Sequence, residues 1–228
     1  MPPPAFTTEG GEEKEITILL TGFGPFGDIP TNPSWEIVSS LPPAIPRTPT
    51  TPKIRLLRPA QPLPVSYPAT LSQIPPLLSA HRDVSYVIHC GVAPLWKHFA
   101  VERQAHRAGY EGRDVDGVVV GDARGEPWPE VLRTTVDVDG VLERWRGLSP
   151  GVDLRVSDDA GHYLCDFIYY CSLAHFWEKG GGNGEGERPV LFLHVPGEGL
   201  GPEAVQHGQS VTMNLIRALV SSGMSSKG

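Results

Sequence analysis

The segment from Ser157 to Tyr170 places Cys165 near the start of an expected helix. The first turn of a helix carries unpaired backbone N–H groups and the positive end of the helix dipole, and both stabilise a thiolate. A cysteine in that position can act as a nucleophile, although many cysteines only fill a core. We expect a side chain of Ser157, Asp158 or Asp159 to cap this helix.

A nucleophilic cysteine needs a base to take its proton and a third group to orient that base. Histidine is the natural base because its ordinary pKa lies near neutral pH. His194 closes an apolar run, residues 190–195, and Glu102 follows small and apolar residues that could hold its carboxylate partly out of water. We expect His194 as base and Glu102 as its orienter, against the simpler interpretation of a core histidine and a surface glutamate.

A glycine-rich segment, TGFGPFG at residues 21–27, follows another apolar run. It matches the GxGxxG pattern of dinucleotide-binding proteins, but Pro25 stiffens the turn and the next helix starts only near Asn32, which disfavours nucleotide binding. Phe23 and Phe26 favour the apolar wall of a substrate pocket, with two core phenylalanines as the alternative. Asn32 either caps the following helix or lines that pocket.

The cysteines and histidines show no metal-binding spacing. Cys165 and Cys171 are six residues apart, and neither CxxC nor HExxH occurs. His89 and Cys90 would point to opposite faces of a strand. We therefore expect no metal.

The elements that position these residues alternate along the chain. Strands are expected at residues 16–20, 54–57, 84–90, 154–157 and 190–195, and helices at 32–41, 71–80, 138–146, 160–178 and 202–221. The second helix is the weakest, since Pro75 and Pro76 interrupt it. Residues 42–53 are expected to form a surface connection, and residues 97–125 a loop with short strands. Such alternation predicts a mostly parallel sheet with helices on both faces.

The distinctive segments fall at or just after expected strand ends. They are residues 22–27 with Asn32, residues 91–102, residues 157–165 and residues 194–196. Sites in parallel sheets gather at the carboxyl ends of strands. We therefore expect these segments to meet at one edge of the sheet.

Composition limits the classes of function. The chain has 228 residues, a net charge of −7 and no basic run, so neither nucleic acid nor an anionic membrane surface is expected as a partner. Three cysteines are too few for a disulfide framework, and no apolar stretch reaches the length of a membrane span. These features predict a soluble intracellular protein. We expect one domain at residues 16–221, a flexible N-terminal tail at 1–15 and a C-terminal tail at 222–228.

Over residues 16–221, the chain resembles the pyroglutamyl peptidase I, or pyrrolidone carboxyl peptidase, family of cysteine peptidases. TGFGPFG with NPSW at residues 32–35 is similar to the opening of that family, and GVAP at 91–94 with VER at 101–103 to its glutamate motif. SDDAGHYLCDFIYY at 157–170 is similar to its cysteine motif, which is the most specific, and FLHVP at 192–196 to its histidine motif.

The resemblance implies a single-domain three-layer α/β/α sandwich around a mostly parallel twisted sheet, with no cofactor and a cytoplasmic location. It implies Cys165 as nucleophile, His194 as base and Glu102 as orienter in the removal of N-terminal pyroglutamate from peptides. Three departures stand out. Ala100 replaces the usual Ser or Thr, no arginine aligns securely near the oxyanion, and residues 197–201 are rich in glycine.

Two other functions stay open from the sequence. One is a catalytically silent relative that binds peptide ends, and the other is a cysteine amidase acting on other small amides. A homo-oligomer is possible, because the resemblance covers both monomers and tetramers.

Overall fold

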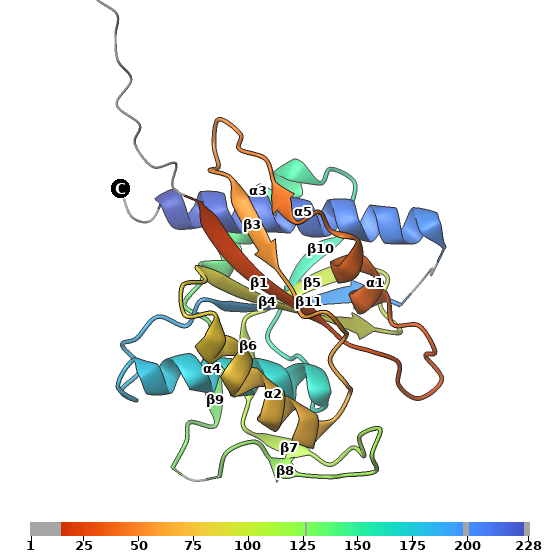
Figure 1. The fold of residues 1–228 in the computed structure, drawn as a ribbon, viewed down its shortest axis with the longest axis vertical. Helices are drawn as coiled ribbons and strands as arrows, with labels where there is room; N and C mark the ends of the chain where they lie inside the picture. The colour runs from red at the N-terminus through yellow and green to blue at the C-terminus, as the bar shows by residue number, and fades with distance from the viewer. Residues whose placement is uncertain (1–14, 126, 198–200, 226–228) are drawn as a thin grey trace, which may run out of the picture.

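The computed structural model describes residues 15–125, 127–197 and 201–225. A seven-stranded mixed sheet lies at its centre with helices on both faces (Figure 1). In spatial order the strands are β10 (Leu154–Ser157), β5 (Phe99–Glu102), β11 (Val190–Pro196), β4 (Tyr86–Ala93), β1 (Ile16–Gly22), β3 (Ile54–Leu57) and β2 (Ala44–Ile45).

The sheet is mostly parallel, as expected. Strands β11, β4, β1 and β3 run in one direction, whereas β5 pairs antiparallel with β11, and β10 runs parallel to β5. The strands before the site segments therefore do not all run in one direction, because Glu102 ends β5 and the segment before Cys165 follows β10, and both strands run against β11. Only five residues connect β4 to β5, which is too short for a parallel crossover, so the chain must return antiparallel.

Five helices cover the two faces of the sheet. They are α1 (Pro33–Ser40), α2 (Tyr67–Ala80), α3 (Val138–Leu148), α4 (Leu164–Lys179) and α5 (Pro202–Ser225). Helices α1, α3 and α5 lie on one face and α2 and α4 on the other, which makes three layers (Figure 1). Across the described ranges, we find no helix with the length and apolar character that a membrane crossing needs.

Two small sheets extend the layer that contains α4. One pairs β6 (Gln104–His106) with β9 (Val131–Arg133), and the other pairs β7 (Ala108–Tyr110) with β8 (Gly121–Asp122). The loop with short strands expected at residues 97–125 thus contains β6, β7, β8 and the central strand β5, whereas β9 lies beyond it. A strand at the sheet edge, β2, also lies inside the expected surface connection.

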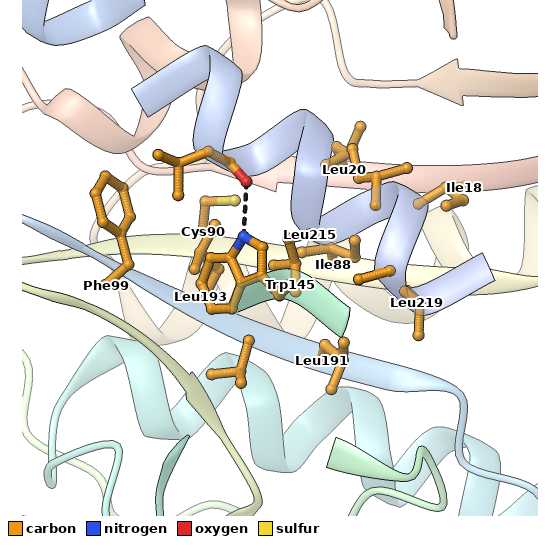
Figure 2. Packing of buried hydrophobic residues seen from close by; sticks show 14 of the residues in the cluster. Ile18, Leu20, Ile88, Cys90, Phe99, Trp145, Leu191, Leu193, Leu215 and Leu219 are labelled. Atoms are coloured by element: carbon orange, nitrogen blue, oxygen red, sulfur yellow. Dashed lines mark hydrogen bonds between the residues drawn. The ribbon is translucent and has the colours of Figure 1, made fainter. Parts of the chain in front are cut away.

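The core on the α5 side is built around Trp145, which is fully buried (Figure 2). Its indole nitrogen donates a hydrogen bond of 2.9 Å to the carbonyl of Val211, which ties α3 to α5. Leu215 and Leu219 of α5 pack in the same cluster as Ile18 of β1. Packing therefore fixes α5 along the sheet, and the buried hydrogen bond joins α5 to α3.

Helix α2 continues through Pro75 and Pro76, so the expected interruption is wrong. Ile74 and Leu78 are buried one turn apart, and their packing holds the helix together. The carbonyls left without an N–H partner belong to exposed residues one turn earlier, where water can bind them.

The cysteine helix begins at Leu164, four residues later than expected. Its N-cap is Tyr163, which makes no side-chain capping bond, so the predicted caps are wrong. The reason is a turn at Gly161, where φ is +81° and the N–H bonds to the Asp159 carboxylate. Cys165 is consequently the second residue of the helix.

The chain ends differ from expectation at the C-terminus. Helix α5 continues to Ser225, so residues 222–225 belong to the helix and the predicted tail is too long. Ser222 is buried there, which shows that packing on the sheet layer extends past residue 221. The N-terminal tail at residues 1–15 lies outside the described residues except for Glu15.

Candidate active site

Cys165 lies in the first turn of α4, and its sulfur packs over Gly91 of β4. A Cβ atom added at Gly91 would lie 2.7 Å from the Cys165 sulfur and 2.7 Å from the ring of Phe192. Real Cβ atoms essentially never come this close to a neighbour, so a side chain at this position would displace the sulfur or the ring, and glycine leaves room for both. The sequence pattern identified residues 91–102 as a candidate site segment, but it did not show that Gly91 leaves room for the sulfur.

His194 projects from β11 on the same side of the sheet as Cys165. It is paired in register with Gly91 on one side and with Ala100 of β5 on the other. The Nδ1 atom of His194 lies 2.7 Å from Oε1 of Glu102. Because Glu102 is paired with the residue two positions before His194, the two side chains are diagonal cross-strand neighbours.

The charge on His194 is set by its neighbours. Burial by itself lowers the pKa of His194, but the Cys165 sulfur, through its charge and a hydrogen bond, and the Glu102 carboxylate outweigh that effect. Together they raise the pKa of His194 to about 9. The arrangement therefore favours a protonated His194 between the Cys165 sulfur and the Glu102 side chain at neutral pH.

Glu102 is fully buried, so it is not the surface glutamate of the simpler interpretation. Its Oε2 atom has no hydrogen-bond partner among the described residues, while Tyr169 donates to its backbone carbonyl at 3.0 Å. Burial and the nearby Glu102 charge raise the pKa of Tyr169 well above its ordinary value, which keeps that phenol a donor. Ala100 is buried beside His194 and offers no hydroxyl group.

Two aromatic rings enclose the imidazole of His194. The ring centroid of Phe192 lies 4.8 Å from that of His194, and Trp96 meets His194 edge-on at 5.3 Å. Phe192 and His194 are two positions apart on β11, which puts them on one face of the strand. The period of a strand could have identified Phe192, but nothing local identified Trp96.

Another buried histidine lies on the same face and plays a different role. The two ring nitrogens of His89 bond to the hydroxyls of Thr21 at 2.7 Å and Ser172 at 2.8 Å. Burial lowers the pKa of His89 to about 3, so the ring stays neutral. His89 therefore links β1 and α4, and both of its ring nitrogens are engaged in hydrogen bonds.

The N-terminal segment places its predicted pocket residues at the end of β1. Phe23 is almost completely buried in the core on the α4 side, whereas Phe26 is partly exposed. Asn32 accepts from the N–H and hydroxyl of Ser34 and donates to the carbonyl of Gly24 at 2.9 Å. Asn32 thus caps α1 and also anchors the loop that carries both phenylalanines; a pocket role stays a prediction.

The other two departures from the family pattern are the arginines and the glycine-rich segment at residues 197–201, and both have local structural explanations. Arg107 is buried and lies 3.3 Å from the Asp122 carboxylate, and Arg113 bonds to the carbonyl of Gly117, so both have partners away from Cys165. Gly197 lies against the backbone of Pro94, where an added Cβ would come within 2.4 Å of the carbonyl oxygen. Residues 198–200 of the glycine-rich segment lie outside the described residues.

These contacts assemble the elements of nucleophilic catalysis at the start of one helix. The sulfur of Cys165 is partly exposed and lies beside N–H groups of the first helical turn. His194 contacts the sulfur and is oriented from behind by Glu102. Such a set can attack a carbonyl carbon and stabilise the resulting oxyanion.

Comparison with known proteins decides the family. The model of the pyroglutamyl peptidase family matches residues 16–209, which include Cys165, His194 and Glu102. The chain belongs to the pyroglutamyl peptidase family. It is 31% identical to pyroglutamyl-peptidase 1 of Mus musculus over 205 residues, covering 88% of each chain. It is 29% identical to the pyrrolidone-carboxylate peptidase of Cupriavidus taiwanensis, over 79% of this chain and 78% of the relative.

Solved structures of the pyroglutamyl peptidase family share the fold. The pyrrolidone carboxyl peptidase of Thermococcus litoralis matches with a TM-score of 0.73 at 22% identity, covering 92% of this chain and 96% of that one. The enzyme of Pyrococcus furiosus matches with a TM-score of 0.71 at 23% identity, covering 90% and 98%. The expected single-domain α/β architecture is thereby confirmed.

Proposed function

We propose that this chain is a cysteine exopeptidase, an omega peptidase that removes N-terminal pyroglutamate from peptides. The observation that carries the proposal is the chain of contacts from Cys165 to His194 to Glu102 at the start of α4. It occurs in a member of the pyroglutamyl peptidase family. The family suggests the substrate, and the geometry supplies the chemistry.

In the first half-reaction, the Cys165 sulfur attacks the carbonyl carbon that follows the pyroglutamyl ring. Backbone N–H groups at the start of α4 stabilise the oxyanion of the tetrahedral intermediate. Because Nδ1 of His194 is engaged with Glu102, Nε2 is the atom left to face the sulfur. The proton on Nε2 passes to the departing amine, the C–N bond breaks, and a thioester remains.

In the second half-reaction, neutral His194 takes a proton from water, and the hydroxide attacks the thioester carbon. The C–S bond breaks, free 5-oxoproline leaves, and the Cys165 sulfur departs as a thiolate while the proton stays on His194. Glu102 stabilises the imidazolium in both steps and fixes its orientation. The cycle needs no cofactor.

Specificity follows from the neutral end group of the substrate. Pyroglutamate ends in a lactam, not an ammonium, so an apolar wall formed by Phe23 and Phe26 suits it. Pairing of the lactam N–H and C=O with backbone groups would reject a free N-terminal proline, since an unpaired buried partner costs about 1–3 kcal/mol. Asn32 would support this wall by holding the loop at Gly24.

The test is release of a fluorophore from a pyroglutamyl amide, with the prolyl amide in parallel. We expect turnover of the pyroglutamyl amide alone, and Cys165→Ser should lower kcat/KM by more than about 1,000-fold. Cys171→Ser, a change of a buried cysteine six residues along α4, should retain activity. Equal rates on the two amides would contradict the pocket assignment.

The same assay separates the two alternatives. Saturable binding of a pyroglutamyl peptide without product release would identify a catalytically silent relative, for which Ala100 is the motivating observation. Turnover of non-peptide amides without turnover of pyroglutamyl peptides would identify a cysteine amidase. The free thiols of Cys90, Cys165 and Cys171 support a reducing compartment, and we propose the cytoplasm.

A further inference from the structure

Three side chains with metal-binding atoms meet beside the start of α4, outside the contacts used for catalysis. They are His106 at the end of β6, His162 in the loop before α4, and Asp166 in the first turn of α4. One ligand atom from each lies within 4.8 Å of the others. The centroids of the two imidazole rings are 5.2 Å apart.

Asp166 is fully buried and held in place by neutral donors. The backbone N–H of His106 donates to both carboxylate oxygens, at 3.1 and 3.2 Å. The Tyr110 hydroxyl shares its one proton between Oδ2, at 3.0 Å, and the carbonyl of His106. A carboxylate buried away from water is costly unless charge or enough hydrogen bonds compensate it, so this position favours a nearby cation.

His106 points a nitrogen atom at this carboxylate without a hydrogen bond. Its Nδ1 atom is buried and has no hydrogen-bond partner among the described residues, yet it lies 3.4 Å from Oδ2 of Asp166. Buried ring nitrogens are normally paired, so this one calls for a missing group. A metal ion bound to Oδ2 of Asp166 would give Nδ1 of His106 a partner.

His162 completes the set from the solvent side. It is exposed, so an ion can reach the cluster from outside. Gly109, with φ of +102°, lies against the ring: a Cβ atom there would be 2.8 Å from Nδ1 of His162. Because Gly109 has no side chain, the ring of His162 has room to lie beside His106 and Asp166.

We propose that His106, His162 and Asp166 bind one divalent transition-metal ion of the zinc type. Two imidazoles and one carboxylate are a donor set that Zn²⁺ accepts, with water in the fourth position, whereas Ca²⁺ and Mg²⁺ prefer oxygen ligands alone. The hydrogen bonds from Tyr110 and from the His106 backbone orient the carboxylate ligand. The bound ion ties the loop before the catalytic helix to β6.

The competing explanation is an ion pair between protonated His106 and Asp166, with His162 uninvolved. The two explanations differ in whether His162 matters and in whether metal binds. The experiment uses Cys165→Ser as the parent protein, because a thiolate beside His194 could itself bind Zn²⁺. The parent is titrated with Zn²⁺ in competition with a chromophoric chelator, and its melting temperature is followed in parallel.

We expect one Zn²⁺ per chain in the Cys165→Ser protein and a rise of several degrees in Tm at saturating Zn²⁺. Adding His162→Ala should weaken Zn²⁺ binding at least about 10-fold and abolish most of the Tm rise. Because His162 is exposed, this change should leave the fold intact, which circular dichroism checks. His207→Ala, which removes an exposed histidine of α5, is the matched control and should bind like the parent.

A second variant guards against an indirect effect of the loop. Asp166→Asn keeps an acceptor for the His106 N–H and the Tyr110 hydroxyl but removes the charge, so it should also weaken Zn²⁺ binding. The proposal is overturned if Cys165→Ser shows no saturable Zn²⁺ binding. It is equally overturned if His162→Ala and His207→Ala bind Zn²⁺ alike.

Discussion

The central hydrogen bond of the site joins two buried groups, His194 and Glu102, across a pair of antiparallel strands. The carboxylate has a single partner for Oε1 and none described for Oε2. Its negative charge therefore acts mainly on the imidazole, and through it on the Cys165 sulfur. A mutation that tests this geometry should therefore remove the charge of Glu102 and keep the size of its side chain.

We predict that Glu102→Gln lowers kcat/KM roughly 100-fold or more, since the glutamine keeps the volume but not the charge. The loss of charge also removes one cause of the raised pKa of His194. The alkaline limb of the pH profile, expected near pH 9, should move to lower pH. Glu111→Gln, at an exposed glutamate, is the control. An unmoved alkaline limb would argue against coupling between Glu102 and His194.

Gly91 allows a second prediction at the level of single atoms. Gly91→Ala places a Cβ atom 2.7 Å from the Cys165 sulfur and from the Phe192 ring, so one of them must move. We expect loss of most activity and about 1–3 kcal/mol of the free energy of unfolding. Gly147→Ala, where an added Cβ meets no described atom within 4 Å, should gain up to about 1 kcal/mol. Urea unfolding and the fluorogenic assay measure both effects.

Helix α1 and the loop before it form one unit because Asn32 bonds to both. We predict that Asn32→Ala costs about 1–2 kcal/mol of the free energy of unfolding through loss of the cap. Asn32→Asp keeps the oxygen that accepts from Ser34 but loses the donor to Gly24. If Asn32 also serves the pocket, Asp should retain more stability than activity. If stability and activity fall together in both variants, Asn32 acts only as the cap of α1.

The elements that could be predicted from sequence are those whose signal is local. His194 ends a run of apolar residues and Cys165 precedes a helical stripe, so their placement on β11 and α4 follows from residues nearby. Glu102 belongs to a strand of four residues that pairs with β10 on one side and with β11 on the other, both far along the chain. Its direction and burial are properties of that pairing, which no local pattern contains.

The zinc-type cluster is an extreme case of the same limitation. His106 and Asp166 are 60 residues apart and meet only because β6 packs beside α4. Neither residue lies in a ligand motif, and their spacing differs from every metal signature considered above. Similarly, the prolines of α2 signalled a break that burial of Ile74 and Leu78 overrides.

For the whole molecule, the raised pKa of His194 predicts how stability depends on pH. A histidine whose folded pKa of about 9 exceeds its unfolded value of about 6.5 stabilises the fold fully below pH 6.5. This contribution is lost as pH rises through 9. In Cys165→Ser the main partner of the imidazolium is missing, so the loss should be smaller.

The measurement is the free energy of unfolding of wild type and Cys165→Ser between pH 6.5 and 9.5. We expect the stability advantage of wild type to shrink by an amount on the order of 1–3 kcal/mol over this range. Both proteins share their tyrosines and lysines, so the difference isolates the pair at the site. A difference that stays constant with pH would falsify the ion-pair description.

The three sulfur atoms differ sharply in accessibility. Cys90 and Cys171 are buried, and burial raises the pKa of each thiol to about 12, whereas Cys165 is partly exposed. An alkylating dye applied to the native protein should therefore attach once per molecule. If Cys165 is the nucleophile, as proposed above, the amount of dye incorporated counts the competent molecules. The burial of the other two cysteines would then make this labelling an active-site titration.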